Sequence, residues 1–315
     1  RDTPYFKERL ESIEVKKKSV SQLLSEMAKT GFQGKKLGEI TDIWEEMLKQ
    51  DNVTIFFGYS GSLSTTGMWK IVCWLIERRF IDVLISTGAN ISEDILEAMG
   101  GTYWRGTDMV DDADLLRYQI DRFYDVYADE LEYREMENLI AEFMGELKED
   151  YSFSSREFLH EFGRWLSKRG IKCIVSTAYE KKIPIFCPAL VDSGYGIATV
   201  RAKKKICVDQ MKDFREFMML GEKCKQTGVI YIGGGVPKDF TQLLAVALDL
   251  MRGGEEVFPH KYAIQITTDQ PVWGGLSGCT LKEAISWGKV SAEGKWATCY
   301  CDATIALPLV AHALN

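Results

Sequence analysis

The sequence has few histidines and prolines and no dense cysteine motif. Its 315 residues include three histidines, seven prolines and eight cysteines, and no two cysteines form a CxxC pair. Zinc modules need closely spaced Cys and His ligands, so the absence of a CxxC pair and the small number of histidines exclude the common zinc-binding modules. No apolar run is long enough to span a membrane, and the first residues are charged, without the apolar core of a secretory signal. We therefore expect a cytoplasmic protein with reduced thiols, no metal site and no membrane partner.

The sequence also lacks a surplus of positive charge. It has 39 Lys and Arg against 46 Asp and Glu, a net charge of -7. Nucleic-acid binders usually carry a basic excess, so we expect no nucleic-acid partner. A cationic substrate such as a polyamine remains compatible with this balance.

Short apolar runs alternate with helical patterns along most of the chain. This alternation predicts an α/β fold of Rossmann type: an open, mostly parallel sheet with helices on both faces. Strands are expected at 53–58, 81–85, 183–187, 229–232 and 297–301. Residues 262–269 are expected to form another strand together with the loop at its end. Helices are expected at 19–27, 37–48, 68–77, from 92 onward, 208–224, 240–252 and 304–313. We expect one domain over 1–315, with an N-terminal helical arm at about 1–50.

Residues of about 101–170 have a different composition and are predicted to be a helical insertion. Within it, 104–108 has a loop-like composition, and helical patterns cover 130–147 and 155–167. Three aspartates near its start could attract a basic partner or simply be solvated, namely Asp111, Asp112 and Asp114.

The loop after the first strand is rich in small and hydroxylated residues. Such a loop between a strand and a helix can present backbone N–H groups to a phosphate. The GxGxxG fingerprint is absent, so an ordinary turn remains an equal alternative. Parallel strands end at one edge, so residues 61–65 and 87–90 should lie side by side and face one ligand. A third small-residue turn, Gly233 to Gly235, implies close approach of a ligand or a packed helix.

A lysine follows a short amphipathic pattern near the end of the chain. Thr280 is placed to cap this helix, with Glu283 three residues later as in a capping box. Glu283 and Trp287 share a helical face, and Lys289 follows the helix-ending Gly288. Lys289 is either a solvated C-terminal lysine or a nucleophile whose charge is disfavoured by an apolar wall.

Several motifs, spread over nearly the whole chain, decide between these alternatives. They are Thr30-Gly-Phe-Gln33, Gly58-Tyr-Ser-Gly-Ser-Leu63, Asp82-Val-Leu-Ile-Ser-Thr87, Ile183-Pro-Ile-Phe-Cys-Pro-Ala-Leu190, Gly233-Gly-Gly-Val236, Glu283-Ala-Ile-Ser-Trp-Gly-Lys289 and Cys301-Asp-Ala303. In these motifs and in their order along the chain, the sequence resembles the deoxyhypusine synthase family. That family uses NAD to move the 4-aminobutyl group of spermidine onto one lysine of the precursor of translation factor 5A.

The resemblance implies roles for individual residues. It makes Lys289 the nucleophile that carries the aminobutyl group as an imine, and Glu283 and Trp287 contacts to the amine. It implies NAD contacts at Gly61, Ser62, Leu63, Ser64, Thr65, Thr87, Gly88, Ala89, Glu93, Asp192, Gly234, Thr268, Asp269, Asp302 and Ala303. It also implies a homotetramer with active sites shared between subunits.

The sequence departs from the family pattern in the polyamine half of the site. A histidine of the family is Asp239 here, which we expect to take part in catalysis and amine binding. Other departures are Ile197, Leu243, Trp273 and Leu276. Three interpretations follow: a deoxyhypusine synthase, a related enzyme with another amine donor or acceptor such as a homospermidine-forming one, or a non-catalytic NAD-binding paralogue that pairs with an active subunit.

Overall fold

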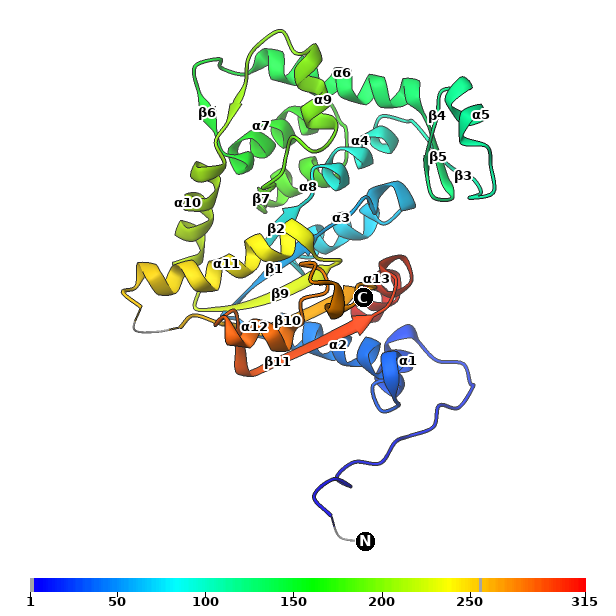
Figure 1. Ribbon diagram of the computed structural model, residues 1–315, viewed down its shortest axis with the longest axis vertical. Coiled ribbons are helices and arrows are strands. Elements are labelled where there is room, and N and C mark those ends of the chain that lie inside the picture. Colours follow the sequence, from blue (N-terminus) through cyan, green and yellow to red (C-terminus); the bar gives the residue numbers. More distant parts are fainter. Residues whose placement is uncertain (1–2, 255–256) are drawn as a thin grey trace.

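A six-stranded parallel sheet forms the centre of the molecule (Figure 1). The computed structural model describes residues 3–254 and 257–315. The strand order is β11-β10-β9-β1-β2-β7, and every neighbouring pair is parallel. The strands are β1 (Val53–Tyr59), β2 (Val83–Ser86), β7 (Ile185–Phe186), β9 (Gln226–Ile232), β10 (His260–Thr267) and β11 (Val290–Tyr300). The expected open, parallel α/β architecture is confirmed.

Helices cover both faces of this sheet. The longer ones are α1 (Val20–Met27), α2 (Phe32–Leu48), α3 (Trp69–Glu77), α6 (Glu130–Glu146), α7 (Ser155–Lys168), α8 (Ile174–Lys181), α9 (Gly194–Arg201), α10 (Gln210–Gly221), α11 (Gly235–Met251) and α13 (Ala303–Leu314). The shorter ones are α4 (Glu93–Ala98), α5 (Asp112–Arg117), α12 (Leu281–Ser286) and the 3-10 turns Ser64–Thr66, Ala89–Ile91 and Pro271–Trp273. Among the described residues, no helix combines the length and apolar character needed to cross a membrane.

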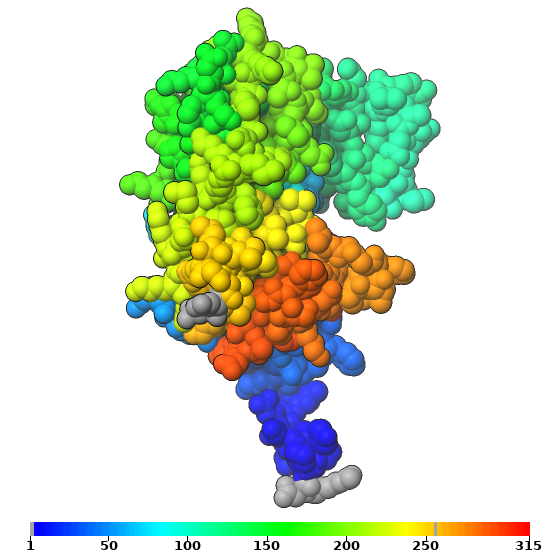
Figure 2. All heavy atoms as spheres, turned by 60° about the vertical axis from the view of Figure 1, so that its left-hand side comes forward, coloured from blue at the N-terminus to red at the C-terminus, as the bar shows by residue number. Residues whose placement is uncertain are grey.

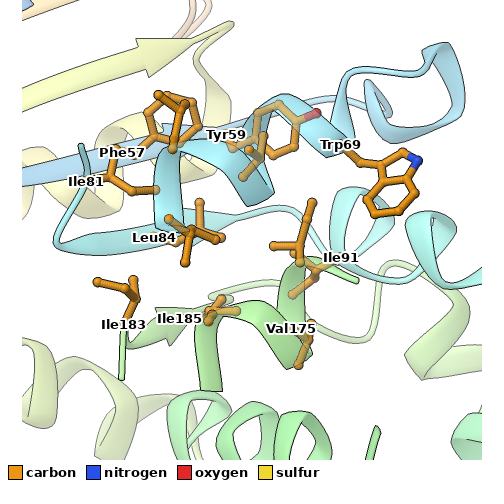
Figure 3. Close-up of a cluster of buried hydrophobic side chains, with 14 of the residues drawn as sticks. Phe57, Tyr59, Trp69, Ile81, Leu84, Ile91, Val175, Ile183 and Ile185 are labelled. Atoms are coloured by element: carbon orange, nitrogen blue, oxygen red, sulfur yellow. The ribbon is translucent and has the colours of Figure 1, made fainter. Parts of the chain in front are cut away.

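Alternating apolar residues explain why two layers of helices form. Phe57 of β1 joins a buried cluster with Trp44 of α2, whereas the preceding Phe56 joins a second cluster with Phe217 of α10. Successive strand residues point to opposite faces, so each apolar strand buries helices on both sides. Figure 3 shows part of the first cluster, where Leu84 and the labelled side chains around it meet between β1, β2 and β7.

The predicted helical insertion is wrong in its first third. Residues 103–129, called the hairpin module below, form a three-stranded antiparallel sheet with α5 at one side. Its strands are β3 (Tyr103–Arg105), β4 (Ile120–Phe123) and β5 (Val126–Asp129). Aromatic and β-branched residues favour these strands, and Tyr124 makes the tight turn with φ +56. The strand pattern was not recognised because the segment contains many aspartates. The two long helices expected after it, α6 and α7, are confirmed.

The N-terminal region also differs from a simple helical arm. Residues 3–18 are non-helical, and α2 packs on β10 and β11 as part of the main body. Other boundaries differ from those expected from the sequence: α11 begins earlier, at Gly235, and β11 begins earlier, at Val290. A two-residue strand, β8 (Cys207–Val208), precedes α10 and pairs with β6 (Ser152–Phe153). Helix α11 starts early because the uncapped glycine turn leads directly into it.

Candidate functional site

The loops that follow β1 and β2 are hydrogen-bonded to each other at the carboxyl edge of the sheet. The Thr87 hydroxyl donates to the Gly61 carbonyl over 2.8 Å, and the Ser62 hydroxyl donates to the Glu93 carboxylate over 2.5 Å. Residues 61–65 and 87–90 therefore lie side by side, as expected from the sequence.

Asn90 fixes the relative position of the two loops, and the sequence analysis did not single it out. Its side chain is fully buried, and its Oδ1 accepts the backbone N–H of Leu63 at 2.7 Å and of Ser64 at 3.2 Å. The Ser64 hydroxyl donates to the Asn90 carbonyl. The sequence signal for Asn90 was an amide side chain within a loop of small residues. If such a side chain is buried, it needs hydrogen-bond partners, and these would be the neighbouring loops.

Glu93 is a nearly buried carboxyl at the start of α4. Only 8% of it is exposed, and burial raises its pKa to about 7, against the lowering effect of the Ser62 hydroxyl. The next residue, Asp94, is fully buried with its pKa likewise raised by burial to about 7, and it accepts the Ile174 N–H at 2.6 Å. Of these two carboxyl groups, Glu93 faces the loops after β1 and β2, whereas Asp94 faces Ile174.

The glycine turn after β9 connects the two halves of the candidate site. Its close neighbour is the backbone at Ser277: a Cβ on Gly234 would lie 2.4 Å from the Ser277 Cα. The Ser277 hydroxyl accepts the Gly235 N–H at 3.1 Å, and the Ser60 hydroxyl donates to the Gly234 carbonyl. The close approach predicted here is therefore made by residues 270–279, and not by a packed helix.

The other predicted cofactor residues lie where further strands end. Thr268 and Asp269 are exposed after β10, and Asp302 caps α13 by accepting the Thr304 N–H at 2.8 Å. The exposed Asp192 follows β7 beside Ser193, whose side chain packs on Gly88. Ala89 opens the turn after β2, and Ala303 is the first residue of α13. Within the described residues, no hydrogen bond links Asp192, Thr268, Asp269, Asp302 or Ala303 to the loops after β1 and β2.

The lysine segment forms the short capped helix that its sequence predicts, but Glu283 does not complete the expected capping box and Trp287 lies at the C-cap, just past the helix. Thr280 caps α12, and its hydroxyl accepts the Glu283 N–H at 2.9 Å. Gly288 adopts a left-handed conformation with φ +68, and the Lys289 N–H then bonds to the Ala284 carbonyl. This turn directs Lys289 away from the end of α12 and into the start of β11.

Lys289 pairs with Asp239 of α11. The distance from Nζ to the Asp239 Oδ1 is 3.1 Å, and the two side chains are 12% and 32% exposed. Nζ also lies 5.2 Å from the centroid of the Trp287 ring, within cation–π range. Trp287 itself is 65% exposed, so on this single chain the indole covers Lys289 from one side only.

A second lysine, Lys238, is buried behind this pair and was missed by the sequence analysis. It is 1% exposed and donates to the Gln265 side chain and to the carbonyls of Leu276 and Cys279, at 2.5–3.1 Å. These acceptors satisfy all three of its N–H groups. Burial lowers the pKa of Lys238 to about 8, while the nearby Glu283 carboxylate opposes the shift. Lys238 thereby holds residues 276–279 against α11 and β10.

The comparisons with known proteins bear on this arrangement. The family model described as deoxyhypusine synthase matches residues 22–314. The chain belongs to the deoxyhypusine synthase family.

Two relatives from one organism show where the chain lies within this family. It is 49% identical to "Probable deoxyhypusine synthase 2" of Archaeoglobus fulgidus, over 91% of this chain and 95% of that protein. It is 38% identical to "Probable deoxyhypusine synthase 1" of the same organism, over 92% of each. The chain is therefore more similar to "Probable deoxyhypusine synthase 2" than to "Probable deoxyhypusine synthase 1" of this organism.

The fold agrees with that of a solved structure. The crystal structure of a "putative deoxyhypusine synthase" from Entamoeba histolytica superposes with a TM-score of 0.65. The match covers 93% of this chain and 91% of that one at 18% sequence identity. At this identity the comparison supports the fold alone.

The positions that depart from the deoxyhypusine synthase pattern cluster partly around the lysine. Asp239 contacts Lys289 directly. Trp273 and Leu276, on the segment before α12, are 81% and 45% exposed, whereas Leu243 lies on α11. Ile197, on α9, is 47% exposed. The replaced positions thus surround the lysine half more than the loops after β1 and β2.

The residues at the carboxyl edge fit a dinucleotide. Gly61 has φ +84 with open space where a Cβ would stand, so a phosphate can approach the backbone of this loop. The Glu93 carboxyl lies at the same loop through its contact with Ser62 and can accept hydrogen bonds from ribose hydroxyl groups. Two cavities, of about 430 and 550 Å³, lie elsewhere at α7 and share Arg156 and His160; none of the predicted site residues lines them.

Proposed function

We propose that this chain is an NAD-dependent aminobutyltransferase that makes deoxyhypusine, moving the 4-aminobutyl group of spermidine to a lysine of the precursor of translation factor 5A. The observation that carries the proposal is the Lys289–Asp239 pair beside Trp287, in a member of the deoxyhypusine synthase family. A cationic donor attracted to Asp239 would be delivered next to the lysine nitrogen.

The carboxyl-edge residues would hold the cofactor. Backbone groups of residues 61–65 and 87–90 would contact its phosphates, and Glu93 a ribose. Gly234, Asp192, Thr268, Asp269, Asp302 and Ala303 complete the proposed set at the ends of neighbouring strands. When bound, NAD supplies the hydride acceptor for oxidation of the donor C–N bond and later returns the hydride.

Lys289 would act as the nucleophile on the oxidised donor. Its Nζ would first give one proton to the Asp239 carboxylate in contact with it. The neutral Nζ then attacks the carbon of the protonated donor C=N bond, the bond from that carbon to the departing diamine breaks, and one further Nζ proton leaves with the diamine. A new C=N bond then joins Lys289 to the four-carbon fragment. The acceptor lysine displaces the fragment by the same exchange. Glu283 and Trp287 would hold the fragment's distal amine by charge and by a cation–π contact.

Covalent trapping tests the proposal. After incubation with NAD and spermidine, borohydride reduction should add one aminobutyl group to the peptide that contains Lys289, as measured by mass spectrometry. Lys289→Arg keeps the charge but cannot form the imine, so it should abolish transfer while NAD affinity stays unchanged. Lys282→Arg, at an exposed position on the preceding helix α12, is the matched control and should keep full activity. Full transfer by Lys289→Arg would refute the proposed mechanism.

A second candidate function is transfer from another amine, or to a small diamine, as in homospermidine formation. The carboxylate of Asp239 at the lysine favours it, because this charge changes the cation that the pocket selects. A panel of amines in the trapping assay distinguishes the two functions by which amine labels Lys289. Labelling by none of them, with NAD binding retained, would favour a non-catalytic paralogue that pairs with an active subunit.

We further propose that copies of the chain associate as a homotetramer and complete each other's sites. Large apolar side chains lie exposed around the candidate residues, among them Val272, Trp273 and Trp287. A contiguous exposed apolar surface of this kind favours association. A second copy placed there would cover Trp287 and exclude water from Lys289.

A further inference from the structure

One face of the hairpin module carries a row of side chains that ends in an exposed tryptophan. Tyr127 of β5 pairs with Trp104 of β3 on one side and with Arg122 of β4 on the other. Residues paired across strands share a face, so these three side chains form one row. Trp104 is 61% exposed.

The opposite face of the module is already occupied. Tyr103 and Phe123 pack on Tyr133 of α6, with ring centroids 6.4 and 6.1 Å apart. The Trp104 face is covered in part by the module itself: Gly106 lies against the Tyr127 ring, and Arg122 pairs with Asp112 of α5, while Trp104 stays exposed. Elsewhere on the module, Met109, Leu116, Tyr118 and Tyr124 are each at least 68% exposed. A protruding surface of this composition indicates a binding face.

The charge of the module limits what this face can bind. Residues 103–129 hold seven aspartates and three arginines, a net charge of -4, while the whole chain carries -7. Arg122 is paired with Asp112 and Arg117 with Asp114, so two of the three cations are neutralised inside the module. Asp108 and Asp125 remain exposed beside the aromatic row. Repulsion disfavours a second copy of this acidic chain here, and attraction favours a basic partner.

The module stands close to the candidate cofactor loops. The Tyr103 hydroxyl, at its base, donates to the Glu93 carbonyl over 2.8 Å, and the Thr102 N–H bonds to Glu132 of α6 at 2.9 Å. In Figure 2 the module projects on the side where the segment before α12 also projects, and the surface is hollowed between the two. A protein bound to the module would therefore reach the carboxyl edge of the sheet.

We propose that the Trp104 face docks a lysine-rich segment of the protein that carries the acceptor lysine; this inference rests on the proposed transfer to a protein lysine. The aromatic row supplies apolar and cation–π contacts to lysine side chains, and Asp108 and Asp125 supply the opposite charge. Docking at the module fixes the acceptor protein while one lysine enters the site.

Binding measurements on the full chain test the docking surface. The probes are the factor 5A precursor and a short lysine- and glycine-rich peptide, each followed by fluorescence anisotropy at two salt concentrations. The variants are Trp104→Ser with Tyr124→Ser, and Asp108→Asn with Asp125→Asn. The matched control is Glu149→Gln with Asp150→Asn, at exposed positions outside the module. We expect each module variant to weaken binding of both probes by about tenfold or more, as for anchors of an interface. The aspartate variant should also lose salt dependence.

Two readouts separate this inference from the proposed function. Borohydride trapping at Lys289 needs no acceptor, so module variants should trap at the wild-type rate while the KM for the acceptor protein rises. If the wild-type chain traps nothing but binds both probes through the module, the docking surface stands and the proposed chemistry fails. Wild-type affinity for both probes in both module variants would overturn the docking proposal. A smaller oligomer formed by the Trp104 variant would also overturn it, because the face would then bind another copy.

Discussion

Asp239 gives the lysine site an anion at hydrogen-bonding distance from the proposed nucleophile. If this carboxylate holds the donor amine, Asp239→Ala should raise the KM for the donor by a factor equivalent to about 1–3 kcal/mol. NAD affinity should stay nearly unchanged, because Asp239 lies outside the loops after β1 and β2. Steady-state kinetics with calorimetry of NAD binding measure both quantities, and Asp239→Glu should restore part of the loss. An unchanged KM for every amine would remove Asp239 from the binding site.

Glu93 makes the stability of the fold depend on pH. Burial raises its pKa from 4.5 to about 7, so the folded chain holds this proton more tightly than the unfolded chain. Its stabilising contribution is therefore complete below pH 4.5 and is lost as the pH rises through about 7. A shift of this size corresponds to about 3 kcal/mol.

The variant Glu93→Gln cannot ionise, which provides the test. Between about pH 5 and pH 8 its free energy of unfolding should fall less than that of the wild-type chain. Denaturant titrations at a series of pH values measure the difference, with the exposed Glu149→Gln as control. Asp94 shifts in the same direction, so part of the dependence should remain in the single variant. Parallel curves for wild type and Glu93→Gln would contradict the assignment.

At the scale of elements, the glycine turn after β9 is one of the tightest packing contacts of the candidate site. A methyl group at Gly234 would meet the Ser277 backbone at 2.4 Å, which flexible side chains cannot relieve. Gly234→Ala should therefore destabilise the fold by about 1–3 kcal/mol and shift residues 276–279. Gly145→Ala is the matched control: it lies in α6 with open space around the new methyl group, and should stabilise by about 0.5–1 kcal/mol. Equal effects in thermal unfolding would contradict the packing argument.

The sequence predicted those elements whose patterns are strong and local. Apolar β-branched runs marked β1, β2 and β9, and a threonine cap marked α12. The hairpin module was missed because its strands are only three or four residues long and the residues between them are rich in aspartate. Short polar strands owe their stability to pairing with distant residues, which composition does not reveal.

The same difference separates the predicted and the missed site residues. Motifs located Lys289 and Glu93, whereas the buried contacts of Asn90 and Lys238 depend on loops brought together by the sheet. Lys238 lies next to Asp239 in the sequence, but its three acceptors come from residues 265–279. Such contacts become visible only once the order of the strands is known.

At the scale of the whole molecule, the chain divides its candidate chemistry between two separate stretches. The loops after β1 and β2 come from residues 59–94, and the lysine half comes from residues 233–303. The glycine turn and Ser277 join them at one edge. Changes at Trp273 or Leu276 can therefore alter the lysine half while the contacts of Asn90 stay in place.

The pairing of β1 with β9 also means that one central strand of the sheet is synthesised well before its partner. These neighbours in the middle of the sheet are separated by about 170 residues. At a synthesis rate of roughly 5–20 residues per second, the ribosome makes β1 about ten to thirty seconds before its partner. Strand β2 can pair with one edge of β1 soon after it is made, but until β9 arrives the other edge of the strand that carries Phe56 and Phe57 is unpaired and can join another chain. The cell must protect the nascent N-terminal half for that interval, before any part of the lysine half exists.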